Sequence, residues 1–170
     1  MMRAMPERTI TVSWDDPHEL AAAARERTGL DFLRAIRDGE LPRAPIQALL
    51  GFWLVEVEPG RITFALEPGE QHFNPIGVVH GGVAGTLLDS AMGAAVHTTL
   101  ELGQGYGTLQ TAFHLVAPIS ERTGEVRAEG RVVHRGSRVA TAEGRLVRAS
   151  DGRVLAHGTS TCLVIGEAAR

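Results

Sequence analysis

Residues 74–89 read NPIGVVHGGVAGTLLD and carry the change from loop to helix on which the fold depends. Pro75, Gly77 and the pair Gly81-Gly82 interrupt regular structure. From Gly82 to Leu100 the apolar residues then recur on one helical stripe, formed by Val83, Leu87, Leu88, Ala91, Ala95 and Val96. The other sides carry small residues, namely Gly85, Ser90, Gly93 and Ala94. The spacing therefore predicts one long helix that a sheet can approach closely from several directions.

Strand patterns lie on both sides of this helix. Phe52–Glu58 and Arg61–Leu66 are short runs joined by Pro59-Gly60, which is typical of a hairpin. Four longer strand candidates follow the helix, at Tyr106–Val116, Glu125–His134, Val139–Ala149 and Val154–Ile165. The order β-β-α-β-β-β-β predicts an α+β fold, with one antiparallel sheet and one long helix laid against it, and disfavours a doubly wound α/β fold.

Helix signals dominate the first part of the chain. Asp16 and Pro17 predict a helix start, with the helix running to about Thr28. A second helix is expected from Leu30 until Gly39, and a short turn over 46–50. We expect residues 1–44 to form an amphipathic helical extension and residues 45–166 the main domain. The extension is either a packing appendage or a lid over a substrate site.

Composition limits the possible functions. The 170 residues contain 17 basic and 20 acidic side chains, so the net charge of −3 disfavours nucleic-acid binding and a basic membrane patch. Cys162 is the single cysteine, which excludes an intrachain disulfide and any multi-cysteine metal site. No apolar run is long enough to span a bilayer. We expect a soluble cytoplasmic protein without a bound metal.

Two features of the 74–89 stretch could carry chemistry. Gly81 and Gly82 lie at the start of the helix, where free amides and the helix dipole favour negative charge. Asp89 is an acid in an otherwise small and apolar helix. The alternative for Gly81-Gly82 is an ordinary tight turn, and the alternative for Asp89 is an exposed position on the helix. Eight residues of helix separate Gly81 from Asp89 by about 12 Å. Either the two are unrelated, or Asp89 meets Gly81 of a second subunit in a twofold dimer.

The pattern Asn-x-x-Gly-x-x-His-Gly-Gly at 74–82, followed by Asp89, resembles the hotdog-fold acyl-CoA thioesterases of the PaaI (phenylacetic acid degradation) type. The similarity covers about residues 45–165. It implies a curved antiparallel sheet wrapped around one long central helix. It also implies a homodimer that joins two sheets edge to edge, and a dimer of dimers as the expected homotetramer.

The resemblance also implies roles for individual residues. The Gly81 N–H would hold the oxyanion, and Asp89 of the other subunit would act as general base or nucleophile. Asn74 would place the water or the thioester, His80 would orient the loop, and Thr108 would help to hold the attacking water. Coenzyme A would contact Gly82 and the turn formed by His134, Arg135, Gly136, Ser137 and Arg138. The alternative for Arg135 and Arg138 is that they are solvent-exposed side chains of a hairpin turn without a ligand. His114 shares its strand parity with Thr108 and is expected on the same face.

These features favour an acyl-CoA thioesterase that acts on aryl- or medium-chain acyl-CoA, with coenzyme A as part of the substrate and no separate cofactor. The acyl channel would be lined by the helix and by Leu50, Phe52 and Trp53. No Gly-x-Ser-x-Gly elbow occurs, which disfavours an α/β-hydrolase. The alternative is a non-catalytic acyl-CoA-binding or sensing protein, which has no need for Asp89. A hotdog hydratase would carry a different Asp/His arrangement.

Overall fold

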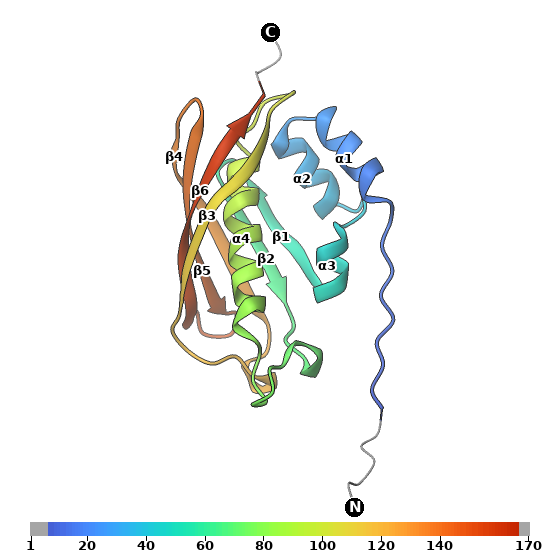
Figure 1. The fold of residues 1–170 in the computed structure, drawn as a ribbon, viewed down its shortest axis with the longest axis vertical. Helices are drawn as coiled ribbons and strands as arrows, with labels where there is room; N and C mark the ends of the chain where they lie inside the picture. The colour runs from blue at the N-terminus through green and yellow to red at the C-terminus, as the bar shows by residue number, and fades with distance from the viewer. Residues whose placement is uncertain (1–6, 167–170) are drawn as a thin grey trace, which may run out of the picture.

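One antiparallel sheet and one long helix form the body of the molecule. A computed structural model describes residues 7–166. The strands are β1 (Phe52–Glu58), β2 (Arg61–Leu66), β3 (Gly105–Leu115), β4 (Val126–Arg135), β5 (Val139–Arg148) and β6 (Val154–Ile165). They form a six-stranded sheet in the order β1-β2-β4-β5-β6-β3. The helix α4 (Gly81–His97) packs against one face of the sheet (Figure 1). The predicted α+β hotdog fold is confirmed.

Three short helices precede the sheet and pack beside α4 and β1 (Figure 1). They are α1 (Pro17–Arg25), α2 (Gly29–Arg37) and α3 (Pro45–Leu50). The Asp16 side chain caps α1 by accepting a hydrogen bond from the His18 N–H, as the sequence predicts. Helix α1 ends at Arg25 rather than near Thr28, because the Thr28 side chain instead caps α2 by accepting from the Asp31 N–H.

Close approach of the sheet to α4 explains several glycines of the strands. A Cβ atom at Gly130 of β4 would collide with the carbonyl oxygen of Ala91. A Cβ atom at Gly144 of β5 would lie 2.9 Å from Met92 Cγ. Leu87, Leu88, Ala91 and Ala95 of the predicted stripe are fully buried or nearly so. The small-sided helix is therefore buried, as its sequence predicts.

The two ends of the sheet differ in their neighbours. β1 pairs with β2 and is covered by α2 and α3, whereas β3 pairs only with β6 among the described strands. A β-bulge shifts the register of β3 between Thr108 and Gln110. Two short 3-10 helices, η1 (Glu70–His72) and η2 (Glu121–Thr123), lie in the loops before α4 and after β3. Within residues 7–166, no helix is long and apolar enough to cross a bilayer.

Candidate functional site

The start of α4 forms a corner of backbone donors. His80 is the N-cap residue, and its Nδ1 accepts a hydrogen bond of 2.9 Å from the Gly82 N–H. Gly81 is the first residue of the helix, so its N–H has no acceptor within the helix. The helix dipole adds partial positive charge at the same point. The Gly81 N–H is therefore suited to bind a developing negative charge.

Asn74 holds the loop that leads into this corner. Its side-chain Oδ1 accepts hydrogen bonds from the Ile76 N–H at 3.0 Å and from the Val78 N–H at 3.3 Å. A backbone hydrogen bond also holds this loop, because the Val79 N–H donates to the carbonyl of Ile119. A cleft of about 280 Å³ lies beside this loop and is lined by Asn74, Gly81 and the segment 115–119. A small polar group can thus approach the Gly81 corner through a fixed loop.

Asp89 lies on α4, eight residues after Gly81, and is half-buried. Its Oδ1 accepts a hydrogen bond of 2.6 Å from Thr111 Oγ1 of β3. Thr111 Oγ1 also lies 3.5 Å from Ser160 Oγ on the neighbouring strand β6. Two strands of the sheet therefore position the carboxylate. Because α4 is continuous, Asp89 and Gly81 of one chain are about 12 Å apart along its axis.

A row of β3 side chains follows α4 from end to end. A Cβ atom added at Gly93 would lie within 3 Å of the Tyr106 side chain. The same holds for Gly85 with Phe113, and for Gly81 with Leu115. Asp89 and Thr111 occupy the same row. Glycines at every fourth position of α4, interrupted by Asp89, thus let the edge strand lie directly on the helix.

The β3 bulge separates the predicted Thr108 from the residue that contacts Asp89. Thr108 pairs with the buried Cys162 before the bulge, and Thr111 pairs with Ser160 after it. Thr108 is exposed, and no hydrogen bond joins it to Asp89. The sequence did not predict Thr111, because side chains of a regular strand alternate between the two faces. Without a bulge, Thr108 and Gln110 would share one face and Thr111 would lie on the other. Two consecutive polar residues, Gln110 and Thr111, interrupt the alternation of the strand and were the only signal of the bulge.

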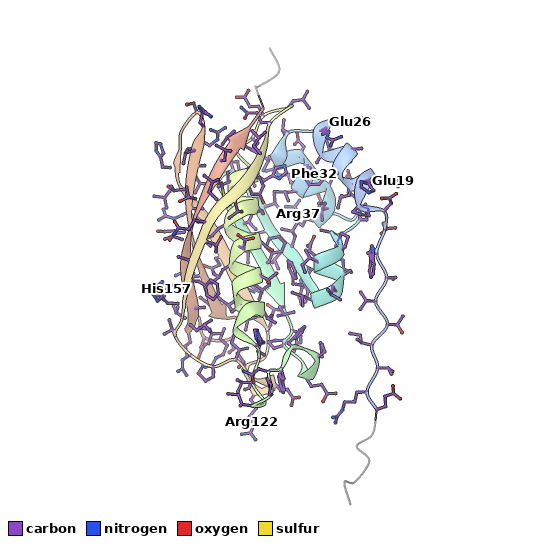
Figure 2. All side chains as sticks on the ribbon, viewed as in Figure 1. Glu19, Glu26, Phe32, Arg37, Arg122 and His157 are labelled. Atoms are coloured by element: carbon purple, nitrogen blue, oxygen red, sulfur yellow. The ribbon has the colours of Figure 1, made fainter. Side chains whose placement is uncertain are left out.

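The same bulge corrects the expectation for His114. His114 was expected on the face of Thr108, but it pairs with His157 across β3 and β6, and their ring centroids are 5.3 Å apart. His157 lies on the sheet face away from α4 (Figure 2). Phe113, its neighbour, is the residue that contacts α4 at Gly85. His114 therefore belongs to the outer face of the sheet.

The predicted coenzyme A turn lies away from Gly81 of its own chain. Val139 pairs with Leu163, and Leu163 with Gly107 near the start of β3. The β4–β5 turn is thus at the end of the sheet beside the C-terminal half of α4, opposite Gly81 (Figure 1). Ser137, Arg138 and His134 are exposed there.

Arg135 ties this turn to the loop before β3. Its guanidinium donates to the Gly136 carbonyl through Nη1 and to Gln104 Oε1 through Nη2. Its Nε is buried and has no hydrogen-bond partner among the described residues. Arg135 therefore holds the turn, whereas Arg138 is the exposed cation next to it.

No metal site is formed by residues 7–166, where no group of three or more His, Cys, Asp or Glu side chains comes together. Cys162 is buried, and its Sγ lies 3.7 Å from Ser160 Oγ. The residues that the structure brings together are Gly81, His80 and Asn74 in one corner, with Asp89 and Thr111 two helical turns away.

Comparisons with known proteins show which family the chain is similar to. Residues 76–155 match the family model described as the thioesterase superfamily. Acyl-coenzyme A thioesterase 13 of Mus musculus is 28% identical over 109 residues, which are 64% of this chain and 76% of the mouse protein.

Solved structures show the same architecture. A phenylacetic acid degradation-related protein from Ralstonia eutropha is 28% identical, with a TM-score of 0.69 over 77% of this chain and 98% of that chain. A Streptococcus mutans protein solved with bound acetyl-CoA is 25% identical, with a TM-score of 0.62 over 69% of this chain and 91% of that chain.

Proposed function

We propose that this chain, which has the hotdog fold and matches the thioesterase superfamily model over residues 76–155, hydrolyses acyl-CoA in a site shared by two copies. The products are a carboxylate and free coenzyme A. The substrate class is aryl- or medium-chain acyl-CoA. The mouse relative is named an acyl-CoA thioesterase, and the S. mutans structure holds acetyl-CoA, and both support acyl-CoA as the general substrate.

One observation carries the two-copy site. Gly81 and Asp89 lie on the same continuous helix, with about 12 Å between them, so a single thioester carbonyl cannot contact both in one chain. Among residues 7–166, the neighbouring strand β3 pairs with β6 alone and leaves its other edge free. It exposes Leu109, Phe113 and Leu115 at 61%, 38% and 56%. An exposed apolar edge strand is a template for pairing with another chain. Twofold pairing of β3 with its copy would complete two sites in one dimer.

In this arrangement, the Gly81 N–H of one copy polarises the thioester carbonyl and stabilises the oxyanion. Such a donor contributes a factor of roughly 10²–10³ to kcat. The Asp89 carboxylate of the other copy activates water as a general base or attacks the carbonyl carbon itself. His80 and Asn74 fix the Gly81 corner through the Gly82 N–H and the 76–78 backbone. Thr111 holds the carboxylate by its hydrogen bond, and Thr108 stays the proposed holder of water.

Antiparallel pairing also supports the predicted place of coenzyme A. The start of one β3 would face the end of the other, and the 136–138 turn lies at the start of β3. The turn of the copy that supplies Asp89 would then approach Gly81 of the other copy. Arg138 offers charge to phosphate there, and Gly136 and Gly82 offer close backbone approach. A dimer of dimers and a cytoplasmic location stay predictions.

Substituting Asp89 by Asn tests the function. Wild-type protein is expected to release thiol from phenylacetyl-, benzoyl- or octanoyl-CoA, and Asp89→Asn to lose a factor of about 10²–10⁴ in kcat, because the amide is neither base nor nucleophile. Asp15→Asn, at an exposed acid, is the control and keeps the wild-type rate. A non-catalytic binding protein would bind acyl-CoA equally in all three forms and release no thiol. An Asp89→Asn rate above about a tenth of wild type would exclude the assigned role.

A further inference from the structure

A second, larger cavity lies between the N-terminal helices and α4. Its volume is about 370 Å³, near the lower end of the range of small-molecule pockets, roughly 300–1,000 Å³. Apolar side chains from α1, α2, β1 and β2 form most of its wall, including Leu20, Phe32, Leu33, Ile36, Phe52 and Phe64. Figure 2 shows Phe32 among the side chains between α2 and α4. Of Leu50, Phe52 and Trp53, which were expected to line the acyl channel, only Phe52 lines this cavity.

The remaining wall comes from α4 and β3, next to Asp89. Ser90, Ala94 and His97 line the cavity from consecutive turns of α4, and Ser90 directly follows Asp89. Tyr106 lines it from the β3 row that also contains Thr111. The Tyr106 and His97 ring centroids are 5.5 Å apart. The cavity therefore reaches the α4 residue next to Asp89 and the start of β3, and Asp89 itself is not part of its wall.

The lining of the cavity suits an uncharged ligand. None of the residues that line it is Asp, Glu, Lys or Arg. Burial lowers the pKa of His97 to about 4, so this imidazole is neutral near pH 7. Phosphates of coenzyme A would find no cation here, whereas an acyl tail would bury its apolar surface.

One polar group in the wall lacks a partner. Gln47 of α3 lines the cavity and is only 5% exposed. Its Oε1 accepts a hydrogen bond of 3.0 Å from the Ala44 N–H, which fixes the side chain at the start of α3. Its Nε2 is buried and has no hydrogen-bond partner among the described residues. Buried donors are nearly always paired in native proteins, so this amide points to a ligand acceptor.

We propose that this cavity binds the distal part of the acyl group, and that Gln47 Nε2 donates a hydrogen bond to an uncharged oxygen on it, such as a keto or ether oxygen. The inference rests on the proposed thioesterase function and narrows its substrate class. It also assigns the N-terminal extension to the substrate site. Gln47 is then a specificity-determining residue, which acts on binding of the tail and not on the thioester.

Pairs of acyl-CoA that differ at one oxygen test the proposal. One pair is 4-methoxyphenylacetyl-CoA and 4-ethylphenylacetyl-CoA, and a second set is octanoyl-CoA with its 5-, 6- and 7-oxo derivatives. The variants are Gln47→Met, which removes the donor at similar volume, and Gln47→Glu, which keeps the acceptor for the Ala44 N–H and removes the donor. Gln71→Met, at an exposed glutamine, is the matched control. Circular dichroism verifies that each variant is folded.

The wild-type kcat/KM is expected to favour at least one oxygen-bearing substrate over its hydrocarbon counterpart by tenfold or more. Both Gln47 variants should reduce that ratio below threefold through KM, while Gln71→Met keeps it. Equal kcat/KM values within every set, or a preference retained in a folded Gln47 variant, would overturn the proposal and leave thioesterase activity standing. Absence of thiol release from every substrate would overturn the proposed function and this inference together.

Discussion

The two edge strands of the sheet, β1 and β3, differ in what covers them. At the β1 edge the chain covers itself, because α2 and α3 pack on β1 and close a cavity lined by Phe52. At the β3 edge nothing in residues 7–166 pairs with the free side of the strand, and Leu109 and Leu115 are more than half exposed. Natural proteins usually protect an edge with charge, proline or a covering segment. The β3 edge carries apolar side chains instead, which indicates a partner strand.

This difference separates two parts of the proposed substrate site. The covered side can be built by one chain, and there the N-terminal helices, β1 and α4 form an open, mostly apolar cavity. On the open side, the Gly81 N–H and the Asp89 carboxylate are too far apart to act on one carbonyl. In the proposed site, the open edge would serve catalysis through a second copy, and the covered edge would serve recognition within one copy.

Removing the Gly81 N–H should have the largest effect on the open side. Gly81 is the first residue of α4, where proline is well tolerated because the N–H makes no helical bond. We expect Gly81→Pro to lower kcat by roughly 10²–10³, because the oxyanion loses its donor. Gly81→Ala is the matched control, since both variants must displace Leu115 Cδ1 but alanine keeps the N–H. Equal rates for the two variants would exclude the Gly81 amide as the donor.

A charge on the free edge should separate the two copies. Leu109 is 61% exposed, so Leu109→Arg removes little packing within one chain, and it should turn dimers into monomers in sedimentation. Activity per chain is expected to fall by at least tenfold. Val133→Arg is the control, because Val133 is equally exposed, at 60%, but lies on the internal strand β4. A fully active Leu109→Arg monomer would contradict a shared site.

On the covered side, the partly buried His97 should make the folding stability depend on pH. Burial holds the pKa of His97 near 4, against an ordinary value of 6.5. Between these pH values the unfolded chain binds a proton that the folded chain does not, so folding stability falls as the pH is lowered through this interval. His97 adds up to about 1.4 kcal/mol per pH unit to this fall. Urea unfolding of His97→Phe should show the shallower dependence, and exposed His157→Gln should match wild type.

Local elements were predictable from the sequence because their signals are local. The Asp16 cap, the small-sided helix α4 and the hairpins lie close to their predicted positions. Each depends on a few neighbouring residues whose backbone preferences agree. The 74–82 motif likewise placed Asn74, His80 and Gly81 together in one corner, because they lie within one short loop and helix start.

Features that depend on distant segments were not predictable. The position of β3 at the edge of the sheet follows from its pairing with β6, which is far away in sequence. The bulge after Thr108 reverses the parity of the strand, and so Thr111 instead of Thr108 contacts Asp89 and His114 faces outward. A bulge adds one residue without changing composition. Gln47 likewise gave no signal, because only the packing of α3 buries its amide.

The most direct test of the shared site mixes two inactive proteins. Gly81→Pro and Asp89→Asn, coexpressed with different tags, should form homodimers and heterodimers. In a shared site each heterodimer contains one intact pair, the Gly81 N–H of one chain with the Asp89 carboxylate of the other. With random pairing, half of the dimers are heterodimers with one working site of two, so about one quarter of wild-type activity should return. Purified heterodimers with no more activity than either parent would show that both groups act within one chain, and would contradict the account.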